Sequence, residues 1–179
     1  MKTGRMKRTW LVVGAVIAVA LVTFSGIALA TMGSGVTAVT VAQARLSDPI
    51  GPGMYNVDGI MVKTKGPVDL VTQVVTFKAN GGTAGWHAHA GPVFVSVISG
   101  TLTTYDADCI KHTYGPGSVL NGPAFFEAGP HHDRLVRNEG TVDAVVYAWW
   151  IVPPGTPLNM LRIDRPDPGC NISDPGPPA

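Results

Sequence analysis

The sequence predicts an all-β domain, a sandwich or barrel of short strands, and three observations predict it. Apolar residues make up 45% of the 179 residues and charged residues only 14%, which excludes a disordered chain and indicates a packed core. The 22 glycines and 15 prolines favour many short elements joined by turns. After residue 30, no stretch keeps the 3.6-residue period of an amphipathic helix, whereas short apolar runs recur between turn signals.

The predicted strands follow one another from residue 68 onwards. Residues 68–79 alternate apolar and polar side chains, as a half-buried strand does. Turns such as Asn80-Gly81-Gly82 and Gly115-Pro116-Gly117 separate this segment from later apolar runs. These runs lie at residues 92–99, 101–106, 117–120, 124–126, 134–138 and 143–152. Short strands at this spacing are typical of an all-β sandwich or barrel.

The composition divides the chain into four parts. They are a hydrophobic N-terminal segment (1–30), a linker and N-terminal arm (31–64), the barrel (65–155) and a proline-rich tail (156–179). Residues 31–52 are small, polar and glycine-containing, which indicates a linker. The last 27 residues hold 8 of the 15 prolines, so we expect an extended tail on the surface.

The first thirty residues have the layout of an export signal. Four lysines and arginines within residues 1–8 precede an uncharged run from Trp10 to Ala30, which ends in the small-residue site Ala28-Leu29-Ala30. A run of about 21 residues at roughly 1.5 Å per residue could also cross a membrane as one hydrophobic helix. A cleaved signal and a retained membrane anchor at residues 10–30 are therefore both open. Either predicts that the rest of the chain is exported.

The charge of the exported part excludes a common class of partner. Residues 31–179 carry 9 lysines and arginines against 12 acidic residues, a net charge of −3. Such a balance offers no basic surface for a phosphate backbone, so we expect no nucleic-acid partner.

The expected export predicts a disulfide between the two cysteines. Outside the cytoplasm a pair of cysteines can form a stable disulfide, and Cys109 and Cys170 allow only one pairing. We expect this disulfide; the alternative is two free, unreactive thiols. No CxxC motif is present.

Candidate chemistry centres on histidines. In a strand, residues i and i+2 face the same side, so His87 and His89 project together at a spacing that suits one metal ion. Two more histidines, His131 and His132, lie downstream. Taken alone, the HxH pattern also fits a pair of surface or hydrogen-bonded histidines.

Two segments together resemble the cupin superfamily. In GGTAGWHAHAGPVFVSVISG, Gly81, His87, His89 and Gly100 fall at the positions of the first cupin signature. GSVLNGPAFFEAGPHHDRLVRNEG is similar to the second signature, with Gly129 and His132 in place. The resemblance covers roughly residues 65–155. It implies a double-stranded β-helix, or jelly-roll barrel, with any metal or ligand inside, and it allows a homodimer.

The sequence departs from the cupin pattern at its ligand positions. Val93 stands where the family has a glutamate, and Glu127 stands where it has the proline of Pro-x-Gly. Counting forward from Gly129 places the third ligand at His132, whereas counting back from Asn138 places Arg134 there.

We take His87, His89 and His132 as the candidate ligands of a divalent metal such as Zn, Fe, Mn or Ni. Trp86, Val93 and Arg134 are the candidate pocket residues. In another register, His131 and Asp133 would face inward instead. Glu127 is a weaker candidate, either a general base near the mouth or a turn residue. A barrel without metal, in which the same residues bind a small and anionic ligand, is also open.

Three function hypotheses follow. The first is a barrel that binds a small molecule in a histidine-lined, metal-loaded pocket. The second is a metal-dependent enzyme, oxygenase-like or isomerase-like. The third is a metal-free structural or interaction module of the cell envelope. The fold alone does not decide between them.

Overall fold

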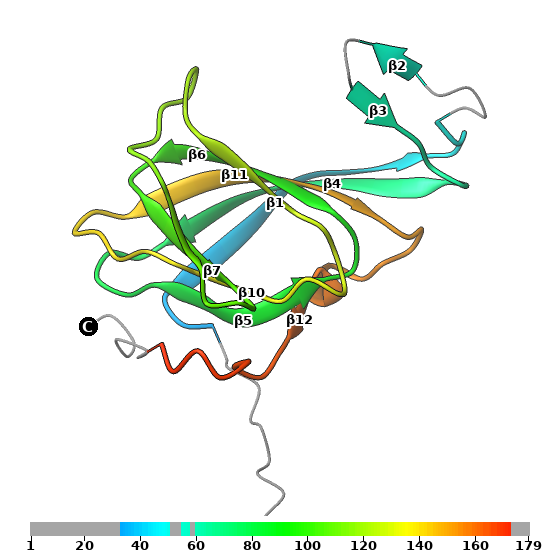
Figure 1. Ribbon diagram of the computed structural model, residues 1–179. Helices are drawn as coiled ribbons and strands as arrows, with labels where there is room; N and C mark the ends of the chain where they lie inside the picture. The colour runs from blue at the N-terminus through cyan, green and yellow to red at the C-terminus, as the bar shows by residue number, and fades with distance from the viewer. Residues whose placement is uncertain (1–32, 51–54, 58–59, 173–179) are drawn as a thin grey trace, which may run out of the picture.

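A computed structural model describes residues 33–50, 55–57 and 60–172, and for 55–57 and 60–62 it describes the backbone only. Figure 1 shows two sheets that face each other. The first sheet has the order β1 (Val36–Leu46), β4 (Val68–Phe77), β11 (Ala144–Val152), β6 (Val93–Ser99), β9 (Ala124–Glu127). The second sheet has the order β12 (Arg162–Asp164), β5 (Thr83–His89), β10 (Arg134–Arg137), β7 (Leu102–Asp106), β8 (Lys111–Tyr114).

Two small elements lie outside these sheets. The strands β2 (Tyr55–Val57) and β3 (Ile60–Val62) pair with each other, and the 3-10 helix η1 (Leu158–Met160) lies between β11 and β12. The described part of the chain contains no helix that is long and apolar enough to cross a membrane. The expected N-terminal hydrophobic helix, residues 1–30, lies outside the described residues.

The strand order confirms the predicted all-β jelly roll. Strands β4–β11 pass from one sheet to the other at each step except between β7 and β8, which pair within the second sheet; this gives the orders 4-11-6-9 and 5-10-7-8. This is the arrangement of an eight-stranded jelly roll made of two Greek keys. β1 and β12 extend the two sheets by one strand each.

The core lies between the sheets because successive side chains of each strand point alternately into and away from the space between them. In β4, the residues with odd numbers from 69 to 77 are buried and the intervening ones are more exposed. β11 alternates in the same way, with the even-numbered residues from Ala144 to Val152 buried. Val71, Val93, Val97 and Leu102 are among the fully buried side chains. Burial of each such side chain contributes about 1.5–3 kcal/mol relative to exposure.

The segment expected to be a linker contains a long strand. β1 pairs antiparallel with β4 over its whole length, with one register shift between Thr40 and Ala42. Its side chains are mostly exposed, because β1 is an edge strand and carries small residues such as Ala38 and Ala44. An edge strand of this kind has a weak apolar pattern, which is why composition alone indicated a linker.

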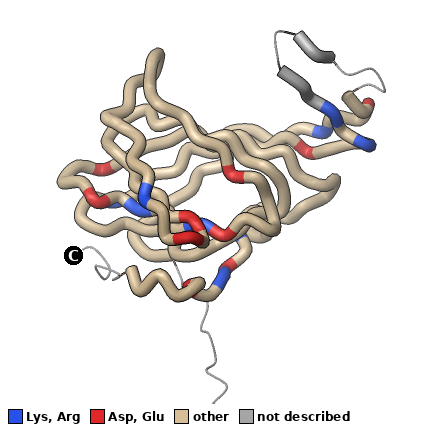
Figure 2. The backbone as a smooth tube through the Cα atoms, viewed as in Figure 1, with Lys and Arg blue, Asp and Glu red and all other residues tan. Residues whose placement is uncertain are grey.

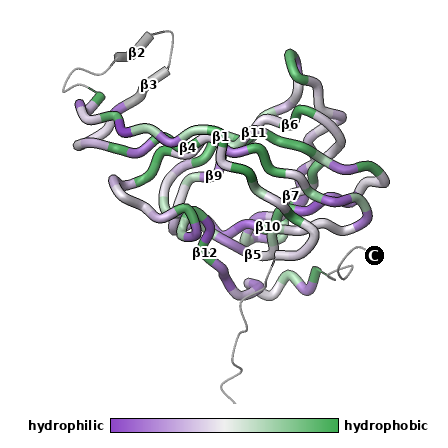
Figure 3. The backbone as a smooth tube through the Cα atoms, turned by 180° about the vertical axis from the view of Figure 1, so that it is seen from behind, coloured by the Kyte–Doolittle hydropathy of each residue, from purple (hydrophilic) through white to green (hydrophobic). Residues whose placement is uncertain are grey.

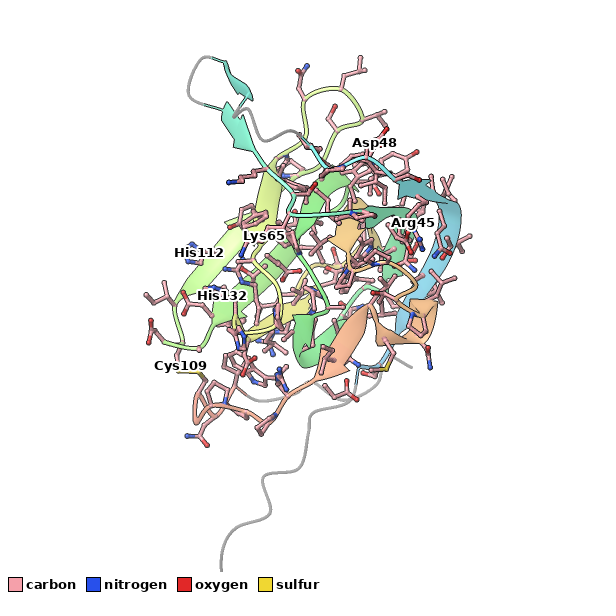
Figure 4. All side chains as sticks on the ribbon, turned by 90° about the vertical axis from the view of Figure 1, so that its right-hand side faces the viewer. Arg45, Asp48, Lys65, Cys109, His112 and His132 are labelled. Atoms are coloured by element: carbon pink, nitrogen blue, oxygen red, sulfur yellow. A yellow bond between two sulfur atoms is a disulfide. The ribbon has the colours of Figure 1, made fainter. Side chains whose placement is uncertain are left out.

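The C-terminal tail crosses the outside of the second sheet. The disulfide between Cys109 and Cys170 confirms the predicted pairing and closes a sequence separation of 61 residues. Figure 4 labels Cys109 where the loop after β7 meets the C-terminal segment. Cys170 and Ile172 pack against a cluster of buried outward-facing side chains, Trp86, Tyr105 and Leu135. The tail is thus extended and attached to the surface as far as residue 172.

Candidate metal centre

Three buried side chains from both sheets meet inside the barrel. His87 and His89 come from β5, and Glu127 comes from β9, the edge strand of the opposite first sheet. One ligand atom from each lies within 4.8 Å of the others. His87, His89 and Glu127 are only 4%, 4% and 5% exposed. Ligand atoms around one metal ion at about 2.1 Å lie up to about 4.2 Å apart, so small side-chain shifts would close this set around an ion.

Backbone carbonyls fix both imidazole rings. Nδ1 of His87 lies 2.8 Å from the carbonyl oxygen of Gly85, and Nδ1 of His89 lies 3.1 Å from that of Leu161. A carbonyl only accepts, so both Nδ1 atoms carry a proton and donate it. In a neutral ring this leaves Nε2 as a lone pair, the form that binds a metal.

The second nitrogen of His89 also faces an acceptor. Its Nε2 lies 2.8 Å from Oε2 of Glu127. A neutral imidazole has one N–H and cannot satisfy two acceptors, so a proton or another cation must lie between His89 and Glu127. The other carboxylate oxygen of Glu127, Oε1, is buried and has no hydrogen-bond partner among the described residues.

Burial and charge set the protonation of the other two ligands. Burial lowers the pKa of His87 to about 4, although the charge of Glu127 opposes this shift. His87 is therefore neutral at physiological pH and free to bind a metal. Burial raises the pKa of Glu127, but the hydrogen bond with His89 and nearby positive charge outweigh it and lower the pKa overall. Glu127 is therefore a carboxylate.

The structure corrects the prediction that His132 is the third ligand. His132 lies in the turn before β10, and its side chain is exposed (Figure 4). The ligand cluster contains Glu127 in its place. His131, like His132, is exposed, and Asp133 forms an ion pair with Arg165, so the alternative register does not bring either of them to the cluster.

The missing family glutamate has a local explanation. Val93 is fully buried and lines the cavity, and Glu127 is its direct cross-strand partner. The carboxylate that the cupin pattern carries at position 93 is therefore supplied at the same level of the barrel by the neighbouring strand. Strand geometry could have indicated this, because residues i and i+2 share a face and Glu127 therefore lies on the same side as Phe125. In the structure both are buried, while Phe126 between them is exposed.

The two remaining pocket candidates differ in their placement. Arg134 is the direct partner of His87 in the β5–β10 pairing and so stands on the same face of the sheet, but it is not among the residues that line the cavity. Its positive charge acts on the Glu127 carboxylate. Trp86 points the other way: it packs under the tail on the outside of the second sheet, and the prediction that it walls this pocket is wrong. A strand turns neighbours to opposite faces, so Trp86 cannot share a side with His87.

The three candidate ligands line a cavity of about 390 Å³ inside the barrel, which is partly open to solvent. Most of its walls are apolar core side chains, among them Val95, Phe125 and Trp150. The Trp150 ring stands edge-on to His89, with 4.6 Å between the ring centroids. Residues of η1 and β12, including Leu158 and Arg162, also contribute to the walls. The size and the few polar groups are those of a small-molecule site.

Comparisons with known proteins give structural matches only. No protein-family profile matches the sequence, and no curated protein is similar to it. Among solved structures, a cupin domain from Bordetella pertussis Tohama I shares 14% identity over 66% of this chain and 95% of that chain, with a TM-score of 0.40.

Two other structural matches are enzymes. A structure of the DMSP lyases RdDddP and RnDddQII matches with 20% identity over 54% of this chain and 42% of that chain (TM-score 0.39). Oxalate oxidase in complex with glycolate matches with 17% identity over 68% of this chain and 54% of that chain (TM-score 0.41). This chain thus spans less than half of the lyase chain and about half of the oxidase chain. Identities this low transfer no substrate to it.

Proposed function

We propose that this chain is a cupin-like barrel that binds one divalent metal ion through His87, His89 and Glu127 and holds a small molecule in the cavity beside it. One observation carries the proposal: both ring nitrogens of His89 face acceptors, 3.1 Å from Leu161 and 2.8 Å from Glu127. A neutral imidazole cannot satisfy both acceptors, so either a proton on Nε2 or a metal ion bound there completes the arrangement. A metal ion also gives the buried Oε1 of Glu127 the partner that it lacks.

The donor set suits the expected metals. Two imidazoles and one carboxylate bind Zn, Fe, Mn or Ni, and they leave coordination positions open. A metal ion bound there would supply a positive centre for an oxygen or nitrogen atom of the small molecule. The protein supplies rigid ligands, because all three stand on paired strands and both rings are fixed by carbonyls. The apolar walls of the cavity exclude water and receive the body of the ligand.

The test is a metal-binding measurement on the full chain, with an exposed histidine as the control. Purified without a histidine tag, the wild-type protein should bind one equivalent of Zn²⁺ or Mn²⁺ by calorimetry and elemental analysis. Glu127→Gln should weaken binding by at least about 100-fold, because a direct ligand matters more than the outer partners, whose loss costs about 10–100-fold. His132→Ala should leave the affinity unchanged. Equal metal content in all three proteins would refute the proposed site.

A metal-dependent enzyme is the second candidate, and the open coordination positions favour it. Two histidines and one carboxylate with open positions are the ligand set of non-haem iron oxygenases. Turnover separates the enzyme from the binding protein: oxygen uptake by the iron-loaded chain that Glu127→Gln abolishes would establish an oxygenase.

Export is part of the proposal. The disulfide between Cys109 and Cys170 supports it, because such bonds persist in oxidising compartments. N-terminal sequencing of the protein purified from its native envelope or medium distinguishes cleavage after Ala30 from a retained membrane anchor. A chain with free thiols found in the cytoplasm would contradict export.

A further inference from the structure

A glutamine stands among the apolar side chains of the cavity wall. Gln73 lies in the middle of β4 and points inward, because the residues of this strand with odd numbers are the buried ones. It is 8% exposed and lines the cavity. Its neighbours on the same face are Val71 and Val75 along the strand and Ala148 across it. An amide thus interrupts a surface that is otherwise hydrocarbon.

The first sheet is a poor environment for a buried amide. Figure 2 shows few charged residues on its strands, and Figure 3 shows hydrophobic stretches along them. Among the cavity-lining residues of this sheet, polar atoms occur only in the side chains of Gln73 and Glu127 and in the indole of Trp150. A buried amide destabilises a fold unless it finds hydrogen-bond partners. The partners of Gln73 therefore decide whether it serves the fold or a ligand.

The fold satisfies one end of this amide. Nε2 of Gln73 donates to Oγ1 of Thr40 on β1 at 3.2 Å. Oε1 of Gln73 accepts no hydrogen bond from the described residues, and it is not fully enclosed by protein, so a molecule in the cavity can reach it. The threonine hydroxyl both donates and accepts, so it can hold either end of the amide. In both orientations Thr40 fixes one end and leaves the other to the cavity.

The charges of the wall indicate what kind of group Gln73 meets. Apart from Glu127, the charged residues that line the cavity are Arg162 and Asp164, and they form an ion pair. Arg162 also donates to the carbonyl oxygen of Ala84 at 2.8 Å. The wall away from the candidate metal ligands therefore carries no net charge. A neutral group suits this wall better than an ion, because an amide does not compensate a buried charge.

We propose that Gln73 determines the specificity of the cavity by hydrogen-bonding a hydroxyl or another neutral polar group on an otherwise apolar small molecule. The inference rests on the proposed function, because it requires that the cavity holds a small molecule. It adds the class of that molecule: a compact body, mainly hydrocarbon, with a neutral hydrogen-bonding group apart from the atom that would face the metal ion. An analogue without this group leaves the Gln73 amide unpaired and is bound less tightly.

The test uses phenol and toluene, which have nearly the same shape and differ by a hydroxyl against a methyl group. Both are titrated by calorimetry into the full chain after a chelator has removed metal. Gln73→Met keeps an unbranched side chain of similar length and removes the amide. We expect it to lower the preference for phenol, given by the ratio of the two dissociation constants, by about 10-fold. Gln43→Met is the matched control and should keep the wild-type ratio, because Gln43 on β1 is exposed and does not line the cavity.

The comparison of ratios removes unrelated effects. Detergent micelles, needed if residues 10–30 are retained, take up toluene equally in every variant, so this partition cancels. A glutamine that served only the fold would change Tm and leave the ratio as it is. Gln73→Leu is the second variant if Gln73→Met does not fold.

The outcomes separate this inference from the metal site. Equal ratios in the wild-type, Gln73→Met and Gln43→Met proteins would overturn the role of Gln73 and leave the metal site standing. If neither compound binds the wild-type chain at millimolar concentration, the cavity holds no such molecule, and the inference falls with that part of the proposed function. A chain that binds no metal but shows the ratio change in Gln73→Met would refute the metal site and support the role of Gln73.

Discussion

Removal of the Cys109–Cys170 disulfide should destabilise the protein by an amount that follows from its loop length. The bond joins residues 61 apart in the sequence. The chain-entropy relation for a closed loop of this size gives about 4 kcal/mol of unfolding free energy at 25 °C. For a domain of this size, each kcal/mol corresponds to about 2–4 °C in Tm, so we expect Tm to fall by about 8–16 °C.

The same change should uncover Trp86. At the start of the tail, the Arg165 amide donates a hydrogen bond to the Trp86 carbonyl at 2.9 Å, and the Arg165 side chain pairs with Asp133 at 3.1 Å and donates to the Pro130 carbonyl at 3.0 Å. A partly exposed ion pair contributes about 0–1 kcal/mol, which does not hold an extended chain in place. Without the disulfide, we expect the residues after Arg165 to leave the Trp86 cluster.

The assay compares the wild-type chain with the double variant Cys109→Ser, Cys170→Ser in scanning calorimetry, and measures quenching of tryptophan fluorescence by acrylamide. A phosphine reductant should lower Tm of the wild-type protein to that of the double variant and leave the double variant unchanged. If both proteins melt within about 2 °C of each other and quench alike, the tail is not held as inferred.

Two further predictions concern polar groups of the turn between β10 and β11. Partial burial raises the pKa of Glu139, but hydrogen bonds from Lys111, Tyr105 and Arg137 lower it to about 2. The folded pKa therefore lies below the unfolded one, so Glu139 stabilises the fold above about pH 4.5 and this contribution is lost as pH falls towards 2. Because the carboxylate is partly exposed, we expect only about 1 kcal/mol. Urea unfolding of Glu139→Gln and wild type should differ by this amount at pH 7 and converge at pH 2; parallel pH curves would contradict it. Asn138 is fully buried, and its amide bridges three backbone groups at 2.8–3.1 Å, so Asn138→Ala should cost about 3 kcal/mol in the same assay; a loss below about 1 kcal/mol would refute this role.

The strands of the core could be predicted from the sequence because their environment is simple. β4 and β11 have one face in the core and one outside, and their alternation records this directly. β1 could not be found in the same way, since an edge strand with small side chains buries little on either face. Its pairing with β4 depends on contacts far along the chain, which local composition does not report.

The metal site could be predicted only where one strand carries it. His87 and His89 lie two residues apart, so strand geometry alone brings them together. The third ligand depends on which strand lies opposite and in what register. Glu127 reaches the cluster because β9 pairs with β6 at Val93 and the two sheets pack face to face. Neither the pairing nor the packing can be predicted from the spacing of nearby residues. His132 satisfied the family spacing but falls in a turn that ends before β10 begins.

The energetics of Glu127 connect the fold to the function. Moving a carboxylate into the interior costs several kcal/mol. The hydrogen bond with His89 and the nearby positive charge offset this cost, but Oε1 has no hydrogen-bond partner among the described residues. An apolar residue at position 127 would fit the surrounding core of Val93 and Phe125 and spare that cost. Stability alone therefore does not explain this glutamate. The metal ion proposed above would explain it, because a cation held by Glu127, His87 and His89 would neutralise the buried charge.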